Sequence, residues 1–326
     1  MLNQRSPKSA TMFSFVQKFW KALVQSVKDF SADNAMKFSA SLSYYTTFSI
    51  APMLIIIIGL AGVFFGREAV KGEVYRQFSG LIGAGAADFL QTTIGSMEIS
   101  GQSWMATAIG IVTLLLGATG VFTELQDSLN QIWSLKAKPR NGIVQYLLNR
   151  VISFSMILTL GFLLIVSLLL NTVIALLSER FFSMYQQWAW VTQILNITFI
   201  VAIVTALFAF MFKFLPDAKI AWQHVWVGAL FTSALFLVGK FAIGFYLSTS
   251  SIATSYGAAG SLAILLAWVY YSSAILFFGA EFTKNYSIVQ GHKIVANDYA
   301  SFVVPKEKEM PQHVDARKVQ EVKQNT

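Results

Sequence analysis

Residues 38–66 read FSASLSYYTTFSIAPMLIIIIGLAGVFFG and contain no Asp, Glu, Lys or Arg. Roughly 20 predominantly apolar residues let a helix cross the hydrocarbon core of a bilayer, which is about 30 Å thick. A strand of a membrane barrel would alternate lipid-facing and lumen-facing residues, whereas Met53–Leu60 is almost continuously apolar. The stretch therefore predicts a membrane-spanning helix.

Five more runs lack these four charged residue types: 99–123, 151–178, 181–212, 220–239 and 241–280. A Ser/Thr-rich break at Ser248–Tyr256 divides the last part of the chain into helices near 220–247 and 256–281. A hydrophobic fraction of 55% and a charged fraction of 12% exclude an ordinary soluble protein. We therefore predict an all-α fold, a polytopic membrane helix bundle with about six transmembrane helices.

The N-terminal segment, residues 1–37, carries a second helical signal. Apolar residues recur at helical spacing, at Met12, Val16, Phe19, Trp20, Leu23, Val27 and Phe30. This pattern predicts an amphipathic helix on the inner leaflet of the membrane, and a helix packed on the bundle is the alternative. The transmembrane domain is then 38–285. The last 30 or so residues contain few apolar positions, and we predict a flexible cytoplasmic tail at residues 286–326.

Lysine and arginine are unevenly placed along the chain. Six precede the first span, four lie between Lys136 and Arg150, two are Lys213 and Lys219, and seven follow Glu281. The opposite side holds four, and Lys240 lies within a span. The positive-inside rule then predicts that both termini are cytoplasmic, so the net charge of +8 reflects topology and membrane lipids rather than a nucleic-acid partner.

The first span begins with a run of hydroxyl side chains that includes Tyr45 and Ser49 and ends at Pro52. In lipid such groups need partners inside the bundle, and a proline frees a backbone carbonyl and kinks the helix. Two interpretations stay open: a kinked helix lining a cavity, or hydroxyls bonded to their own helix or to neighbouring helices. In the first interpretation Tyr45, Ser49, Lys240 and Tyr271 contact the substrate.

Other ionisable groups give no sign of catalysis. Glu124, Asp127 and Glu281 lie near helix ends, where we interpret them as interfacial charges. Cysteine is absent, and His224, His292 and His313 are isolated, so the sequence predicts no metal site and no cofactor. No nucleophile elbow or phosphate-binding loop is present either. The chain is therefore predicted not to be an enzyme.

Four stretches together resemble one bacterial family. They are Ala40–Tyr45 continuing to Ala51-Pro52; Leu125-Gln-Asp-Ser-Leu-Asn130-Gln-Ile-Trp133; Leu215-Pro-Asp217 through Gly228-Ala229 and Gly239-Lys240 to Leu247; and Tyr256-Gly257 through Trp268-Val-Tyr270-Tyr271 to Glu281. Over residues 20–290 the chain resembles the YihY/virulence factor BrkB family, formerly labelled ribonuclease BN. The resemblance implies a bacterial inner-membrane protein with about six spans. It implies little about activity.

Three functions remain in competition. The leading hypothesis is a transporter or lipid-translocating protein of the cell envelope, with an amphiphile or lipid as substrate. The alternatives are an envelope scaffold or assembly protein, and an intramembrane lipid-modifying enzyme that uses Glu281, Lys240 or Tyr271. A nuclease is physically implausible, because no metal-ligand cluster or soluble domain is visible for a large polyanion. The substrate, the coupling ion and the oligomeric state do not follow from the sequence.

Overall fold

The computed structural model describes residues 7–82, 84–97, 120–137, 189–249, 259–292, 294–297 and 300–303. Its helices are α1 (Pro7–Ala32), α2 (Ala35–Phe65), α3 (Arg67–Ile82), α4 (Ala84–Met97), α7 (Ala189–Phe214), α8 (Trp222–Thr249) and α10 (Gly260–Val289). A further helix covers residues 120–132. Four short strands are β1 (Leu135–Ala137), β2 (Ala218–Lys219), β3 (Val295–Ala296) and β4 (Ala300–Phe302).

Four of the described helices are long and apolar enough to cross a membrane. They are Ala35–Phe65, Ile197–Phe214, Trp222–Tyr246 and Gly260–Val289. These correspond to the first, fourth, fifth and sixth predicted spans, so the helical membrane bundle is confirmed. The predicted span 151–178 and residues 99–119 of the predicted span 99–123 lie outside the described residues. Six spans therefore stay a prediction.

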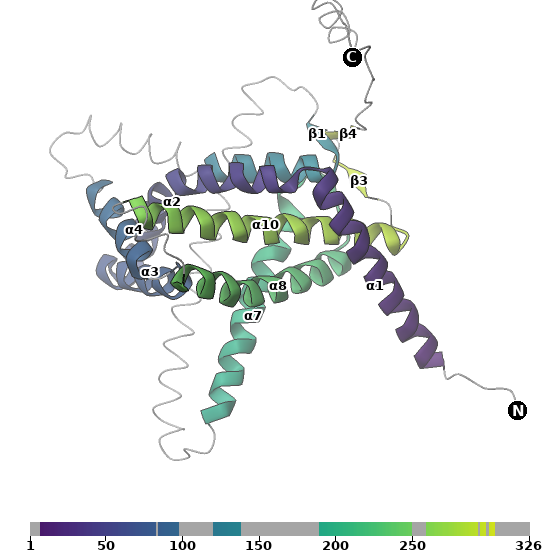
Figure 1. The fold of residues 1–326 in the computed structure, drawn as a ribbon, viewed down its shortest axis with the longest axis horizontal. Helices are drawn as coiled ribbons and strands as arrows, with labels where there is room; N and C mark the ends of the chain where they lie inside the picture. Colours follow the sequence, from purple (N-terminus) through teal and green to yellow (C-terminus); the bar gives the residue numbers. More distant parts are fainter. Residues whose placement is uncertain are drawn as a thin grey trace, which may run out of the picture.

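Helix α10 is the centre of the described bundle. It packs against α2 on one side and α8 on the other, and α1 packs across one end of it (Figure 1). Helices α3 and α4 gather at the other end of α2, and α7 runs obliquely to the other long helices. We call the two ends of the bundle the α1 end and the α3 end.

Two short strands that follow α10 pair with earlier parts of the chain at the α1 end. Strand β4 pairs antiparallel with β1, with Leu135 opposite Phe302, and β3 pairs with β2, with Ala218 opposite Ala296. Helix α10 continues to Val289, and both β3 and β4 lie within residues 286–326, so the division at residue 285 stays a prediction. Backbone pairing orders residues whose side chains alone bury little surface. Residues 304–326 lie outside the described residues.

The largest buried side chains lie where helix 120–132, α7, α8 and α10 meet. The side chains of Trp133, Phe212 and Phe277 are at most 2% exposed. They belong to one apolar cluster with Leu129 and Ile132. In lipid, close packing of such side chains, rather than their removal from water, holds helices together. Helix 120–132 is thereby held in the bundle up to the turn that precedes β1.

Helices α8 and α10 approach closely at two glycines. The side chain of Thr283 on α10 occupies the space where Gly228 on α8 would carry a Cβ, and Thr232 on α8 does the same at Gly279 on α10. Each threonine hydroxyl donates to a carbonyl of its own helix, Thr232 to Gly228 O and Thr283 to Gly279 O, both at 2.7 Å. The contact is thus reciprocal, and it leaves neither buried hydroxyl unsatisfied.

Helix α1 has two apolar faces. One face packs on the bundle: the Phe19 ring lies 5.0 Å from Phe282 and 5.8 Å from Phe231, and Phe30 lies 5.6 Å from Phe278, measured between ring centroids. The other face is exposed and carries Val16, Trp20, Val24 and Val27. Packing on the bundle, the alternative from the sequence, is therefore present, and a second apolar stripe remains on the outer side.

The reciprocal glycine contact can be tested with Gly228→Ala and Gly279→Ala. A methyl group at either position overlaps a threonine side chain, so we expect each variant to lose about 1–3 kcal/mol of stability. The measurement is thermal unfolding of the purified protein in detergent.

Gly244→Ala is the matched control, because nothing lies within 4 Å of a Cβ at Gly244. It should be neutral or slightly stabilising, since alanine favours a helix over glycine by up to about 1 kcal/mol. Thr283→Ala added to Gly228→Ala should restore much of the loss. Equal melting of Gly228→Ala and Gly244→Ala would contradict the contact.

Candidate functional site at the polar end of the bundle

Lys284 is the centre of a charged cluster at the α1 end. Its Nζ lies 2.7 Å from Glu281 Oε2 and 3.3 Å from Asp33 Oδ2, and it donates to the carbonyl of Ile132 at 2.7 Å. Glu281 has no exposed surface, and neither of its carboxylate oxygens accepts a well-aligned hydrogen bond among the described residues. One lysine thus joins α10, the α1–α2 turn and helix 120–132.

Asn285, the next residue of α10, binds α1. Its side-chain amide donates to Asp29 Oδ2 at 2.9 Å and to Ser26 Oγ at 3.3 Å. Ser26 in turn donates to the carbonyl of Ala22. These bonds fix the rotation of α1 on α10, so the apolar outer stripe of α1 has a defined direction.

A second polar cluster forms around Asp217, between α7 and α8. Its carboxylate accepts from Asn130 Nδ2 at 2.9 Å and from Gln126 Nε2 at 3.3 Å, and its backbone N–H donates to Asn130 Oδ1 at 2.8 Å. Burial raises the pKa of the Asp217 carboxyl, while the hydrogen bonds from Asn130 and Gln126 lower it. The cluster ties helix 120–132 to the α7–α8 connection.

An open pocket of about 790 Å³ lies beside the charged cluster at the α1 end. Lys37 and Lys136 contribute positive charge to its walls, and Asp33 and Asp127 contribute negative charge. The remaining lining residues are Ala32, Asn34, Phe38, Asn130, Gln131, Ser134, Leu135 and Val303. We call this space the polar pocket; its mixed charge and amide groups suit a small polar or charged ligand.

Two wall residues of the polar pocket adopt left-handed backbone conformations. Asn34 and Ser134 both have φ of 55°. Asn34 lies in the turn from α1 to α2, and Ser134 precedes β1. Both positions redirect the chain where two elements meet, and asparagine tolerates this conformation better than most residues.

The four predicted substrate contacts form two pairs. A Cβ on Gly120 would lie 3.5 Å from Ser49 Oγ and 3.9 Å from Tyr45 Cδ1, so this pair on α2 faces helix 120–132. Tyr271 on α10 lies against Gly239, the residue before Lys240 on α8. Tyr271 is therefore at the α8–α10 contact, and Lys240 is the residue that follows Gly239 on α8.

The hydroxyl-rich start of α2 is largely satisfied within its own helix. Ser39 donates to Ala35 O at 2.8 Å, Ser43 to Ala40 O at 2.9 Å and Thr47 to Ser43 O at 2.8 Å. Helix α2 continues through Pro52, which is buried. For these three side chains the structure agrees with the second of the two interpretations.

The predicted helix-end charges differ in their surroundings. Glu281 is buried beside Lys284, Asp127 is exposed at the polar pocket, and Glu124 is half-buried on the same helix as Asp127. Glu281 lies ten residues after Tyr271, about 15 Å further along α10. Glu281 and Tyr271, two of the three residues that the enzyme alternative names, therefore do not lie together in one site.

Sequence reasoning missed Asp33, Lys284, Asn130, Gln126 and Asp217 as site residues. A signal was present for three of them, because Gln126 and Asn130 belong to the stretch Leu125–Trp133, and Asp217 closes Leu215-Pro-Asp217. Each stretch contributed to the family resemblance separately. The structure brings the two stretches into contact.

Comparison with known proteins tests the family resemblance. A sequence model of the virulence factor BrkB family matches residues 26–297. The chain belongs to this family. The match covers all four membrane-length helices and both polar clusters at the α1 end, so the BrkB assignment rests on the part of the chain that forms the bundle.

Relatives of this BrkB chain are also membrane proteins by name. A UPF0761 membrane protein of Azotobacter vinelandii is 29% identical over 275 residues, which make up 82% of this chain and 63% of that protein. One from Photobacterium profundum is 28% identical over 277 residues, 80% of this chain and 81% of that protein. The chain spans less than two thirds of the Azotobacter relative. None of these names states an enzymatic activity, and no solved structure matches the chain.

Lys284→Met tests the charged cluster of this BrkB family member. The substitution leaves the fully buried Glu281 without a positive partner, so we expect a loss of about 3–5 kcal/mol of stability. Thermal unfolding in detergent, followed by intrinsic fluorescence, measures the loss.

The double variant Glu281→Gln with Lys284→Met removes both charges and should recover most of the stability. Asp33→Asn is the milder comparison, because the Asp33 side chain is about one third exposed and water can solvate what remains. If the double variant melts as low as Lys284→Met, the buried Glu281 charge is not the cause.

Proposed function

We propose that this protein is a transporter or lipid-translocating protein of the bacterial inner membrane. The observation that carries the proposal is the buried ion pair of Glu281 and Lys284 at the end of a membrane-length helix, beside the polar pocket. Ionisable groups at such positions are expensive and commonly mark substrate or ion routes. A pocket of about 790 Å³ lies within the usual range for small-molecule sites.

The proposed route continues past the two pairs of sequence-predicted residues. Lys240 is half-buried and follows Gly239, against which Tyr271 lies. Its neighbours on α8, Val238 and Phe241, are highly exposed, as expected for lipid contact. In this proposal Lys240 offers a positive charge to an anionic headgroup. Tyr45 and Ser49 contact the substrate on the α2 side of the route. Pro52 permits α2 to bend.

An envelope scaffold is the second candidate function. The hydroxyls of Ser39, Ser43 and Thr47 donate hydrogen bonds to carbonyls of their own helix, so they need no substrate as a hydrogen-bond partner. A scaffold would use the same buried contacts for packing alone. The two candidates differ in what happens when a charge is removed without loss of fold.

Lys240→Met tests the route. The substitution keeps most of the side-chain volume and removes the charge, so we expect normal expression with loss of function in a strain that depends on this protein. The readout is complementation of an envelope phenotype, with Tyr45→Phe and Tyr271→Phe tested singly and in combination.

Phe241→Leu is the control, because the Phe241 side chain is 75% exposed and adjacent to Lys240. It should behave as the parent. If Lys240→Met, Tyr45→Phe, Tyr271→Phe and their combination all behave as the parent too, the route is abandoned and the scaffold takes its place.

We further propose that the α1 end faces the cytoplasm, in accord with the distribution of lysine and arginine. The outer stripe of α1 would then lie on the inner leaflet, with Lys21 and Lys28 reaching anionic headgroups. The half of α1 that packs on α10 gives this helix a fixed depth. Membrane lipids are thus its proposed partner, and no nucleic acid is proposed.

Single cysteines test this orientation, because the chain has none of its own. Cysteines at Ser79, Gln186 and Ser250 should react with an impermeant thiol reagent in cells with a permeable outer membrane, and cysteines at Ser9 and Asn325 should not. A cysteine replacing Trp20 should stay protected after the cells are opened, because lipid covers it. Labelling of both tail positions in intact cells would refute the orientation.

A further inference from the structure

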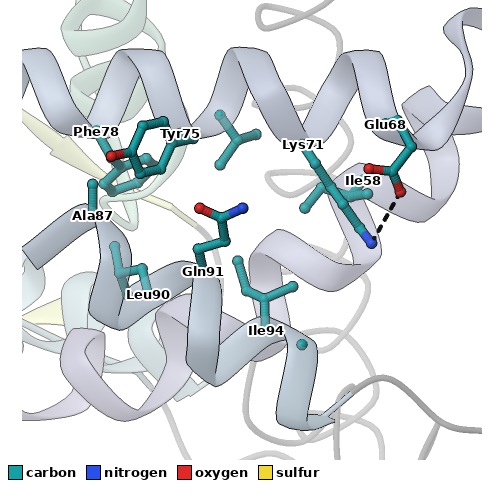
Figure 2. A pocket seen from close by; sticks show the side chains of 11 residues that line it. Ile58, Glu68, Lys71, Tyr75, Phe78, Ala87, Leu90, Gln91 and Ile94 are labelled. Carbon is teal, nitrogen blue, oxygen red and sulfur yellow. Dashed lines mark ion pairs between the residues drawn. The ribbon is translucent and has the colours of Figure 1, made fainter. Parts of the chain in front are cut away.

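The pocket at the α3 end of the bundle has no net charge. It has a volume of about 260 Å³, and its lining residues belong to α2, α3 and α4 (Figure 2). Most of them are apolar, and the two charged ones, Lys71 and Glu68, pair with each other at 3.4 Å. Their charges cancel, so an ionic ligand gains little there.

The α1 end, by contrast, contains two histidines that are far apart in the sequence. His224 lies in the first turn of α8, and His292 follows the end of α10 at Val289. The two imidazole rings lie 4.4 Å apart, measured between ring centroids. The sequence shows these residues as isolated, whereas the fold makes them neighbours.

The end of α10 determines where His292 lies. The N–H of His292 donates to Ser287 O at 3.1 Å, and the N–H of Gly291 donates to Ile288 O at 2.9 Å. These are the two hydrogen bonds of a Schellman motif, and Gly291 has the positive φ, 85°, that the motif requires. The motif reverses the chain after α10 and holds the backbone of His292 beside α8.

Packing holds His224 in place. This residue is 4% exposed, and its ring contacts the ring of Tyr286 on α10 with the centroids 5.9 Å apart. Its backbone N–H donates to Ala221 O at 3.0 Å. His292 is exposed. The pair thus combines one ring that is fixed by its surroundings with one ring that can rotate in solvent.

Gln223 shows that the two ring nitrogens point toward one place. Its side-chain Nε2 lies 3.4 Å from Nε2 of His224 and 3.4 Å from Nε2 of His292. An amide nitrogen only donates, so in this arrangement each ring nitrogen accepts through its lone pair. Two imidazole lone pairs that converge in this way can chelate a transition-metal ion.

A metal ion fits between the two rings once Gln223 moves. Gln223 is exposed, so its side chain can leave this space or turn its amide oxygen toward an ion there. A zinc–imidazole bond is about 2.0–2.1 Å long, and rotation of the exposed His292 ring brings its Nε2 to this distance from an ion on His224. No third His, Asp or Glu joins the pair among the described residues, so water completes the ligand set.

The ligand chemistry selects the class of metal. Neutral imidazole suits Cu²⁺, Ni²⁺ and Zn²⁺, with Cu²⁺ bound most tightly in this series. Ca²⁺ and Mg²⁺ require mainly oxygen ligands. A site of two imidazoles without a carboxylate therefore discriminates strongly against the two alkaline-earth ions.

We propose that His224 and His292 bind a divalent transition-metal ion of the class of Cu²⁺, Ni²⁺ and Zn²⁺. The ion joins the start of α8 to the end of α10. Neither histidine lines the polar pocket, so the metal site does not depend on the proposed transport.

The test measures metal binding by the purified full chain in detergent, prepared without a polyhistidine tag and stripped with a chelator. Titration calorimetry with Cu²⁺, and separately with Zn²⁺, should show saturable binding of one ion per chain. Mg²⁺ at the same concentrations should show none. Absence of saturable binding of both transition metals would overturn the proposal.

His292→Gln removes one ligand from an exposed position, so it should lower the affinity for Cu²⁺ roughly tenfold or more. His313→Gln is the matched control, because the chain has three histidines and the proposal does not use this one. It should bind Cu²⁺ as the parent does. Equal affinities of His292→Gln and His313→Gln would overturn the proposal.

Electron paramagnetic resonance of the bound Cu²⁺ counts the nitrogen ligands directly. The parent should show two imidazole nitrogens, and His224→Gln and His292→Gln should each show one. Melting temperatures without metal show whether the buried substitution His224→Gln leaves the protein folded; if it does not, His292→Gln decides alone. A parent spectrum without two nitrogen ligands, or an unchanged spectrum in His292→Gln, would overturn the proposal.

Discussion

The close contact between α8 and α10 is the constraint on which the rest of the described bundle depends. In lipid, apolar side chains gain little by associating with each other, so helices are held together by close packing and satisfied polar groups. Gly228 and Gly279 permit that packing, and the Thr232 and Thr283 hydroxyls return to their own helices instead of demanding a partner. The position of α10 relative to α8 follows from these four residues.

The polar residues of α10 are placed by this contact. Thr283 lies between Glu281 and Asn285, so the helix rotation that directs Thr283 toward α8 directs Lys284 toward Asp33 and Ile132, and Asn285 toward α1. The charged cluster, the turn from α1 to α2 and the polar pocket are consequently one structural unit. A shift of α10 would disturb all three together.

The two ends of the bundle have different chemistry. The α1 end combines a buried ion pair, side-chain amides and an open polar pocket, whereas the pocket at the α3 end is lined mainly by apolar side chains, with Lys71 and Glu68 as its charged residues. Between the ends, Tyr271 of α10 lies against Gly239 of α8.

The sequence by itself determined the fold class and the positions of the membrane-length helices, because hydrocarbon thickness sets the length of an uncharged run and lipid excludes unsatisfied backbone. It also indicated both apolar sides of α1, as a single stripe that the structure divides between the bundle and the outside. These properties depend on local composition and spacing, and both can be read along the chain.

Only the tertiary structure decided which residues meet. Gly228 and Gly239 belong to the stretches that carry the family resemblance, but the sequence does not show that they and Gly279 make room for side chains of another helix. Asp217 meets Asn130 across 87 residues, and Lys284 meets Asp33 across 251. Such contacts depend on helix rotation and packing distance, and neither quantity is encoded in the hydropathy of a single helix, so the site residues at the α1 end emerged only when the helices were placed together.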